Sequence, residues 1–146
     1  MKILRRVIIV ICMIFILSDS TILLPDSKGK YSDEAIIYDI NKNMLIDNDK
    51  FIVERLILDD GITYMEYKLI RNEQGWSFNN GALEIRNQEN EIFKYRGGWS
   101  SGKLWGEQGV LEFSKIKITD NIIIKYEQYD RLVEMTVDVS KEGDNS

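Results

Sequence analysis

Three tryptophans are the residues best suited to bind a ligand by surface contact. Trp76 lies in a Gln-Gly-Trp-Ser-Phe stretch, and Trp99 and Trp105 lie in the glycine-rich segment 97–109. This segment contains five glycines and is predicted to be the longest loop of the chain. An exposed aromatic ring stacks on the apolar face of a pyranose, so the three rings are candidate sugar-binding residues. The alternative is that the rings fold back and cap one end of the fold, since tryptophan is highly buried on average.

Two acidic clusters, Asp47-Asn48-Asp49 and Asp59-Asp60, offer the oxygen ligands that calcium prefers. They flank a predicted strand over 51–58, and eight residues at about 3.4 Å each separate them by roughly 27 Å. The distance is too large for one shared ion, and neither cluster has the ligand spacing of a calcium loop. We therefore expect turn residues here and no metal site.

Catalytic chemistry is not predicted. The chain has no histidine, which removes the commonest general base and the commonest metal ligand. Glu107, Glu112 and Glu127 have no spacing that demands the paired carboxylates of a glycosidase. The Ser100-x-x-Lys103 pattern lies in a glycine-rich surface segment that is poorly suited to burying a lysine and lowering its pKa. We expect no enzyme and no cofactor, and the net charge of −5 predicts no nucleic-acid partner.

The N-terminus has the pattern of an export segment. Three basic residues precede an uninterrupted apolar run over 7–17, and small residues follow it. Residues 1–20 are predicted to be a signal peptide cleaved after Ser20. The alternative is a retained anchor over 7–24, which would carry the costly Asp19. Either interpretation places the rest of the chain outside the cell or at its surface, with membrane contact through this segment only. Cys12, the single cysteine, lies within the run, so the exported part has no disulfide.

The remainder of the chain has the spacing of short strands. Apolar and polar residues alternate over 132–139, and turn signals such as Asp59-Asp60-Gly61 and Asn79-Asn80-Gly81 separate apolar runs. The pattern predicts an antiparallel β-sandwich over 34–140, with an eight-stranded barrel as the alternative. Residues 21–33 are predicted to be a polar tether, and 141–146 a frayed tail. The apolar runs with strand spacing lie at 36–38, 51–58, 62–70, 82–86, 91–95, 110–114, 115–119, 122–126 and 132–139, from which we expect seven or eight strands.

Residues 59–67, Trp76-Ser77-Phe78, 82–85 and the strands of 116–139 together resemble one exported family. These are the immunoglobulin-like domains of unknown function in membrane-anchored, anti-sigma-factor-like surface proteins of Gram-positive bacteria. The resemblance covers 35–139. It implies an all-β, immunoglobulin-like antiparallel β-sandwich of about seven to eight strands, preceded here by an N-terminal apolar export helix.

The resemblance brings no catalytic or ligand motif, so no site residue is carried over. Such proteins usually have a cytoplasmic domain before the membrane segment, whereas six residues precede the apolar run here. The resemblance thus implies a stand-alone exported accessory domain. We expect a non-enzymatic interaction or sensing module at the cell surface, with an envelope protein or a glycan as partner. The alternative is a carbohydrate-binding module that uses Trp76, Trp99 and Trp105.

Overall fold

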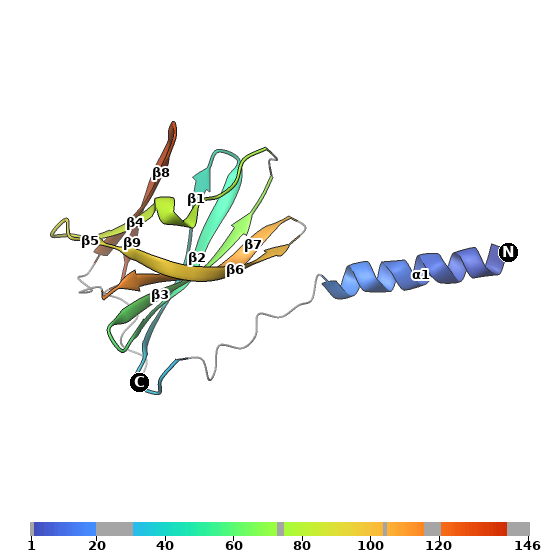
Figure 1. The fold of residues 1–146 in the computed structure, drawn as a ribbon, viewed down its shortest axis with the longest axis horizontal. Helices are drawn as coiled ribbons and strands as arrows, with labels where there is room; N and C mark the ends of the chain where they lie inside the picture. The colour runs from blue at the N-terminus through green and yellow to red at the C-terminus, as the bar shows by residue number, and fades with distance from the viewer. Residues whose placement is uncertain (1, 20–30, 73–74, 104, 116–120, 140–146) are drawn as a thin grey trace. The chain divides into compact units, whose positions relative to one another are not determined.

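The computed structural model describes residues 2–19, 31–72, 75–103, 105–115 and 121–139. The chain divides into two units, 1–31 and 32–146. The first unit contains helix α1 (Lys2–Asp19), which includes the apolar run of the N-terminus (Figure 1). No helix among the described residues meets the length and apolarity needed to cross a membrane.

The second unit is built from antiparallel strands, which confirms the all-β fold class. The first sheet has five strands in the order β1-β2-β3-β7-β6, and the second has four in the order β5-β4-β8-β9. A short 3-10 helix, η1 (Asn80–Ala82), lies in the connection between the sheets. The strands, labelled in Figure 1, are β1 (Ile36–Ile46), β2 (Asp49–Asp59), β3 (Ile62–Ile70), β4 (Leu83–Asn87), β5 (Ile92–Phe93), β6 (Tyr95–Lys103), β7 (Gly106–Ser114), β8 (Asn121–Gln128) and β9 (Arg131–Asp138).

The core lies where the inward-facing residues of both sheets meet, as expected of a two-layer all-β fold. Four aromatic rings extend across it. Phe51 and Tyr67 of the first sheet stack with ring centroids 5.4 Å apart, and Phe78 from the connecting segment stacks on Tyr126 of the second sheet at 5.1 Å. Phe51 and Phe78 join the two pairs at 5.2 Å. Offset stacking of this kind adds to the free energy gained by burying the rings, so the connecting segment is held as part of the core.

Strands β1 and β9 pack along each other and close one side of the fold. Lys42 Nζ of β1 donates to the backbone oxygen of Thr136 at 3.3 Å. Arg131, at the start of β9, forms an ion pair with Asp47 in the β1–β2 turn. These contacts join the ends of the two sheets, where neither strand has a further partner within its own sheet.

The turn signal Asp59-Asp60-Gly61 was correctly interpreted. Asp60 and Gly61 both have positive φ, 43° and 79°, as required by the two-residue hairpin turn between β2 and β3. The alternation over 132–139 is also confirmed, because Val133, Met135, Val137 and Val139 pack toward the core and the residues between them do not. Asn79 initiates η1, where its side chain accepts a hydrogen bond from the Gly81 N–H at 3.0 Å.

The prediction of a long loop over 97–109 was wrong. The segment forms most of the β6–β7 hairpin, which contributes two strands to the first sheet. Its glycines interrupt the apolar alternation that would have indicated a strand, and close strand packing requires three of them, Gly98, Gly106 and Gly109. A Cβ built on Gly109 would lie 2.2 Å from the Trp99 backbone oxygen. The described residues contain nine strands, against the seven to eight expected.

Several sequence predictions lie wholly or largely outside the described residues. They are the cleavage point after Ser20, most of the polar tether over 21–33, most of the predicted strand over 115–119 and the tail over 141–146.

Candidate functional site

Trp76 packs into the fold. Its ring meets Phe78 in a T-shaped contact with centroids 6.4 Å apart, and the Arg131 guanidinium lies 5.0 Å from the ring centroid. The indole Nε1 is buried and has no hydrogen-bond partner among the described residues. A ring enclosed by a cation and other aromatics contributes mainly to packing, so this position favours a structural role for Trp76.

Trp99 and Trp105 belong to the same hairpin and are exposed. Trp99 lies in the middle of β6 with 43% of its surface exposed, and Trp105 lies in the β6–β7 turn with 69% exposed. The backbone oxygen of Trp105 accepts a hydrogen bond from the Arg71 N–H at 2.9 Å, which attaches the turn to the end of β3. The structure therefore places these two sequence-predicted site residues on one hairpin, and Trp76 in the segment that connects the sheets.

The register of the first sheet places Trp99 on its outer face, the face turned away from the core. Trp99 is opposite Val110, and Val110 is opposite Glu66. Val110 is only 5% exposed and Ile57 is fully buried, although neither belongs to the core cluster between the sheets. We define the apolar face as the set Ile37, Arg55, Ile57, Tyr64, Glu66, Trp99 and Val110, which lie on this outer surface by register.

One ion pair lies within the apolar face. Arg55 Nη2 is 2.6 Å from Glu66 Oε2, and Arg55 Nε donates to the same oxygen at 2.7 Å. The Glu66 side chain is 10% exposed and the Arg55 side chain 32%. Arg55 and Glu66 neutralise each other, so a partner that covers this pair need not supply a counter-charge for it.

Tyr64 is opposite Ile57 on the apolar face. Burial, reinforced by the negative charge of Glu112, raises the pKa of its hydroxyl. The phenol is therefore neutral throughout the physiological pH range, when it can both donate and accept a hydrogen bond.

The outer face of the second sheet has a different character. Lys125 Nζ is 2.5 Å from Glu127 Oε2 on β8, and Arg86 forms an ion pair with Glu84 on β4. Leu132 is an exposed apolar residue of this face, at 61%. Charged side chains paired in this way are typical of a surface that faces solvent. Apolar residues buried outside the core are thus found on the outer face of the first sheet.

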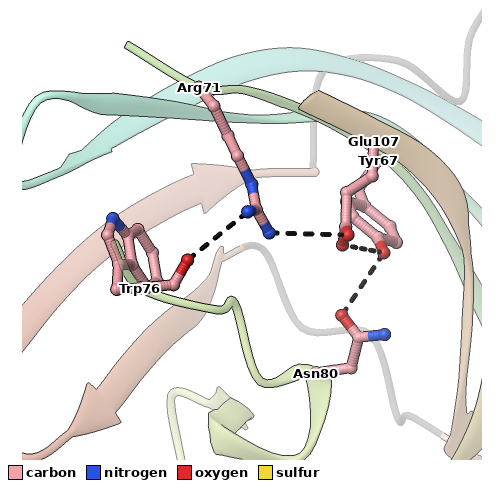
Figure 2. Close-up of polar contacts among 5 residues, drawn as sticks. All are labelled: Tyr67, Arg71, Trp76, Asn80 and Glu107. Atoms are coloured by element: carbon pink, nitrogen blue, oxygen red, sulfur yellow. Dashed lines mark hydrogen bonds and ion pairs between the residues drawn. The ribbon is translucent and has the colours of Figure 1, made fainter. Parts of the chain in front are cut away.

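A polar network connects β3, β7 and the segment that crosses between the sheets (Figure 2). The Tyr67 hydroxyl donates to Glu107 Oε1 at 2.8 Å and lies 3.3 Å from Asn80 Oδ1. Arg71 links β7 to the connecting segment. Its Nη2 lies 4.0 Å from Glu107 Oε2, and its Nη1 donates to the Trp76 backbone oxygen at 3.4 Å. Burial, reinforced by the hydrogen bond to Glu107, raises the pKa of Tyr67.

This network has a structural role, and the sequence did not predict it. Tyr67 and Glu107 are separated by 40 positions and become neighbours only when β3 pairs with β7. Glu107 lies on the inner side of β7, Glu112 lies on its outer side, and Glu127 is in the second sheet. The three glutamates weighed as hydrolytic residues therefore do not converge.

The prediction of turn residues in the two acidic clusters holds for Asp47, Asn48 and Asp60 and is wrong for Asp49 and Asp59, which are the first and last residues of β2. Asp49 is fully buried and accepts a hydrogen bond from the Asn72 N–H at 2.6 Å. Asp59 accepts one from the Ser32 N–H at 3.0 Å, and the side-chain and backbone hydrogen bonds from Ser32 lower the pKa of Asp59. Within the described ranges, no three acidic or cysteine side chains form a group suited to a metal ion.

Comparisons of the chain with protein-family models, curated proteins and solved structures gave no match. The surface chemistry described above is therefore the basis for the functional interpretation.

Proposed function

We propose that this chain is an exported, non-enzymatic β-sandwich domain that acts as an interaction or sensing module at the cell surface. Its partner, an envelope protein or a glycan, binds the apolar face of the first sheet. The observation that carries the proposal is the difference between the two outer faces. Ile57 and Val110 are buried on one of them beside the partly exposed Trp99 and Ile37, whereas ion pairs occupy the other. The other outer face has two exposed apolar residues, Ile92 and Leu132, but they lie on the opposite edge strands β5 and β9, whereas Ile57 and Val110 are buried on inner strands of the first sheet. Apolar residues grouped on one face are typical of interaction sites.

Trp99 is the expected anchor of this contact. Tryptophan, tyrosine and arginine contribute most often to the binding energy of protein interfaces, and Trp99, Tyr64 and Arg55 lie on the apolar face. Arg55 is already oriented by Glu66. A side chain held in place before binding loses less conformational entropy when the partner arrives.

Export through residues 1–20, or anchorage through 7–24, is part of the proposal and is supported by the basic residues that precede the apolar run. The two antiparallel sheets support the sandwich architecture of the proposed immunoglobulin-like fold. The strand order differs in both sheets, because constant-type immunoglobulin domains combine a sheet of strands A-B-E-D with a sheet of strands C-F-G, whereas here β1, β2 and β3 are consecutive neighbours in a five-stranded sheet and the second sheet has four strands.

Capture from an envelope extract by the full-length chain, immobilised in a mild nonionic detergent, tests the proposal. Ile37→Lys on the apolar face and Leu132→Lys on the other outer face form a matched pair, since the two side chains are 47% and 61% exposed. We expect Ile37→Lys to reduce capture at least tenfold and Leu132→Lys to leave it unchanged. Equal capture by both variants, or no capture by the parent chain, would contradict the proposal.

Carbohydrate binding is the second candidate, and the exposed ring of Trp99 is the observation in its favour. Ser101, on the same side of β6, is opposite Gln108 and places polar groups next to the ring. Sugar sites combine an apolar stacking surface with a few polar groups. Glycan-array binding that is lost in Trp99→Ala and Trp105→Ala, with melting temperatures unchanged, would establish this function. Binding that persists in both variants would refute it.

A further inference from the structure

Strand β6, yellow in Figure 1, forms one end of the five-stranded sheet. All of its nine residues are exposed except Gly97, which is half-buried. Among the described elements, only β7 runs along it. From Gly97 to Lys103 its register with β7 is regular, so this part of the strand has an uninterrupted outer edge. At about 3.4 Å per residue, the regular part spans roughly 24 Å.

The other sheet ends differ from β6. Strands β1 and β9 pack along each other, and β5 has only two residues. A sheet edge presents backbone N–H and C=O groups that can pair with a further strand. Of the long edges that the described ranges contain, β6 is therefore the one whose length and exposure suit strand addition.

We propose that an extended acidic segment of a partner protein adds to β6 as a sixth strand of the first sheet. Backbone hydrogen bonds would supply the contact, and side chains would supply selectivity, as in other cases of strand addition. The inference deepens the proposed function by naming a partner class, and rests on that function, but it uses the strand edge rather than the apolar face.

The positive charge of β6 favours an acidic segment as the added strand. Arg96 and Lys103 lie near its two ends, and the strand contains no acidic residue, although the whole chain has a net charge of −5. An acidic segment pairs with both cations. A second copy of the chain is disfavoured, because full antiparallel pairing of two β6 strands brings Arg96 of one copy next to Lys103 of the other.

The two faces of β6 would offer a partner strand different neighbours, with small residues on one face and an indole ring on the other. Gly98, Ser100 and Gly102 alternate on the side of the strand that continues the inner face, and a Cβ built on Gly102 would meet nothing within 4 Å. Trp99 lies on the opposite side. A partner strand would thus place alternate side chains beside small residues and beside an indole ring.

The experiment measures binding of synthetic peptides to the full-length chain in a mild nonionic detergent by fluorescence anisotropy. The probe is an eight-residue peptide of alternating valine and threonine that begins and ends with aspartate, which matches the spacing of Arg96 and Lys103. We expect the same peptide with lysine at both ends to bind about tenfold more weakly, since two exposed ion pairs are replaced by repulsion. Equal affinity of both peptides, or no binding of either, would overturn the inference.

Two controls test the mode of binding. Probe peptides N-methylated at every second residue, in the two alternative phases, should differ, because only alternate N–H groups of an added strand point at β6. The double substitution Arg96→Glu with Lys103→Glu should reverse the preference toward the lysine peptide. Equal effects of both methylation phases, an unchanged preference, or a dimer through β6 in sedimentation would refute strand addition.

Ile37→Lys separates this inference from the proposed function. The substitution alters the apolar face and leaves β6 intact, so peptide affinity should be unchanged while capture of the envelope partner falls. Loss of peptide binding in Ile37→Lys would refute the edge as the binding surface.

Discussion

Replacing Tyr67 with phenylalanine tests whether the polar network of Figure 2 stabilises the fold. The substitution deletes one oxygen from a side chain that is 1% exposed and leaves its stacking on Phe51 in place. The lost hydroxyl donates to the carboxylate of Glu107 at 2.8 Å. A hydrogen bond to a charged group contributes more than a neutral one, so we expect the free energy of unfolding to fall by about 2 kcal/mol at pH 7.

The assay is urea unfolding of the full-length chain, followed by tryptophan fluorescence. The midpoint should decrease without a change in the m-value. Tyr129→Phe is the matched control, because that side chain is 88% exposed and its substitution should change the stability little. A double-mutant cycle with Glu107→Gln should give a coupling energy of about 1 kcal/mol. A loss below about 0.5 kcal/mol in Tyr67→Phe would show that the network does not stabilise the fold.

The same variant has a pH signature. Burial raises the pKa of Tyr67 in the folded chain, whereas an unfolded tyrosine titrates near pH 10. The stabilisation due to its neutral form is therefore complete below about pH 10 and is lost as the pH rises toward the folded-state pKa. Above pH 10, the parent chain should lose up to about 1.4 kcal/mol per pH unit more than Tyr67→Phe. Parallel curves for the two proteins would refute the assigned cause.

Three further predictions concern other contacts. Gly109→Ala should lower the free energy of unfolding by about 2 kcal/mol or more and accelerate amide exchange in β6, because the new Cβ would meet the Trp99 backbone oxygen at 2.2 Å; unchanged exchange would contradict it. Asp49→Ala should cost about 1–3 kcal/mol in urea unfolding, since it leaves the Asn72 N–H without its carboxylate, and Asp33→Ala serves as the exposed control. Ser32→Ala should raise the pKa of Asp59 measured by NMR titration; because that pKa is lowered in the folded chain, the stabilisation from this contact is present at neutral pH and lost as the pH falls through the folded-state pKa.

Much of the fold could be predicted from local patterns. A strand with one buried face repeats its apolar residues every second position, as in β9, and an Asp-Gly pair between two such runs predicts a tight hairpin. Local patterns did not predict the hairpin formed by β6 and β7. Strand β6 has no buried side, and its glycines interrupt the alternation of side chains. At one of them, Gly98, the backbone of β7 approaches too closely for a Cβ.

Local sequence patterns predicted only some of the residues of the candidate site and of the polar network. Trp99 was predicted as a candidate because an exposed indole suits ligand contact, and the structure places it on a sheet face rather than on a loop. The hydrogen bond between Tyr67 and Glu107 had no sequence signal, because the two residues are 40 positions apart and either could face solvent or core. Pairing of β3 with β7 decided that they meet.

The sequence by itself determined the strand-forming segments, the tight turns and the apolar N-terminal run, because each depends on residues close together in the chain. The tertiary structure decided which face each segment presents. A register shift between Val53 and Arg55 in β2 changes the alternation, so that Ile57 lies on the outer face although Val53 faces the core. Since side chains alternate between faces at every residue, one extra residue transfers the following side chains to the opposite face. That shift creates part of the apolar face to which we assign the function.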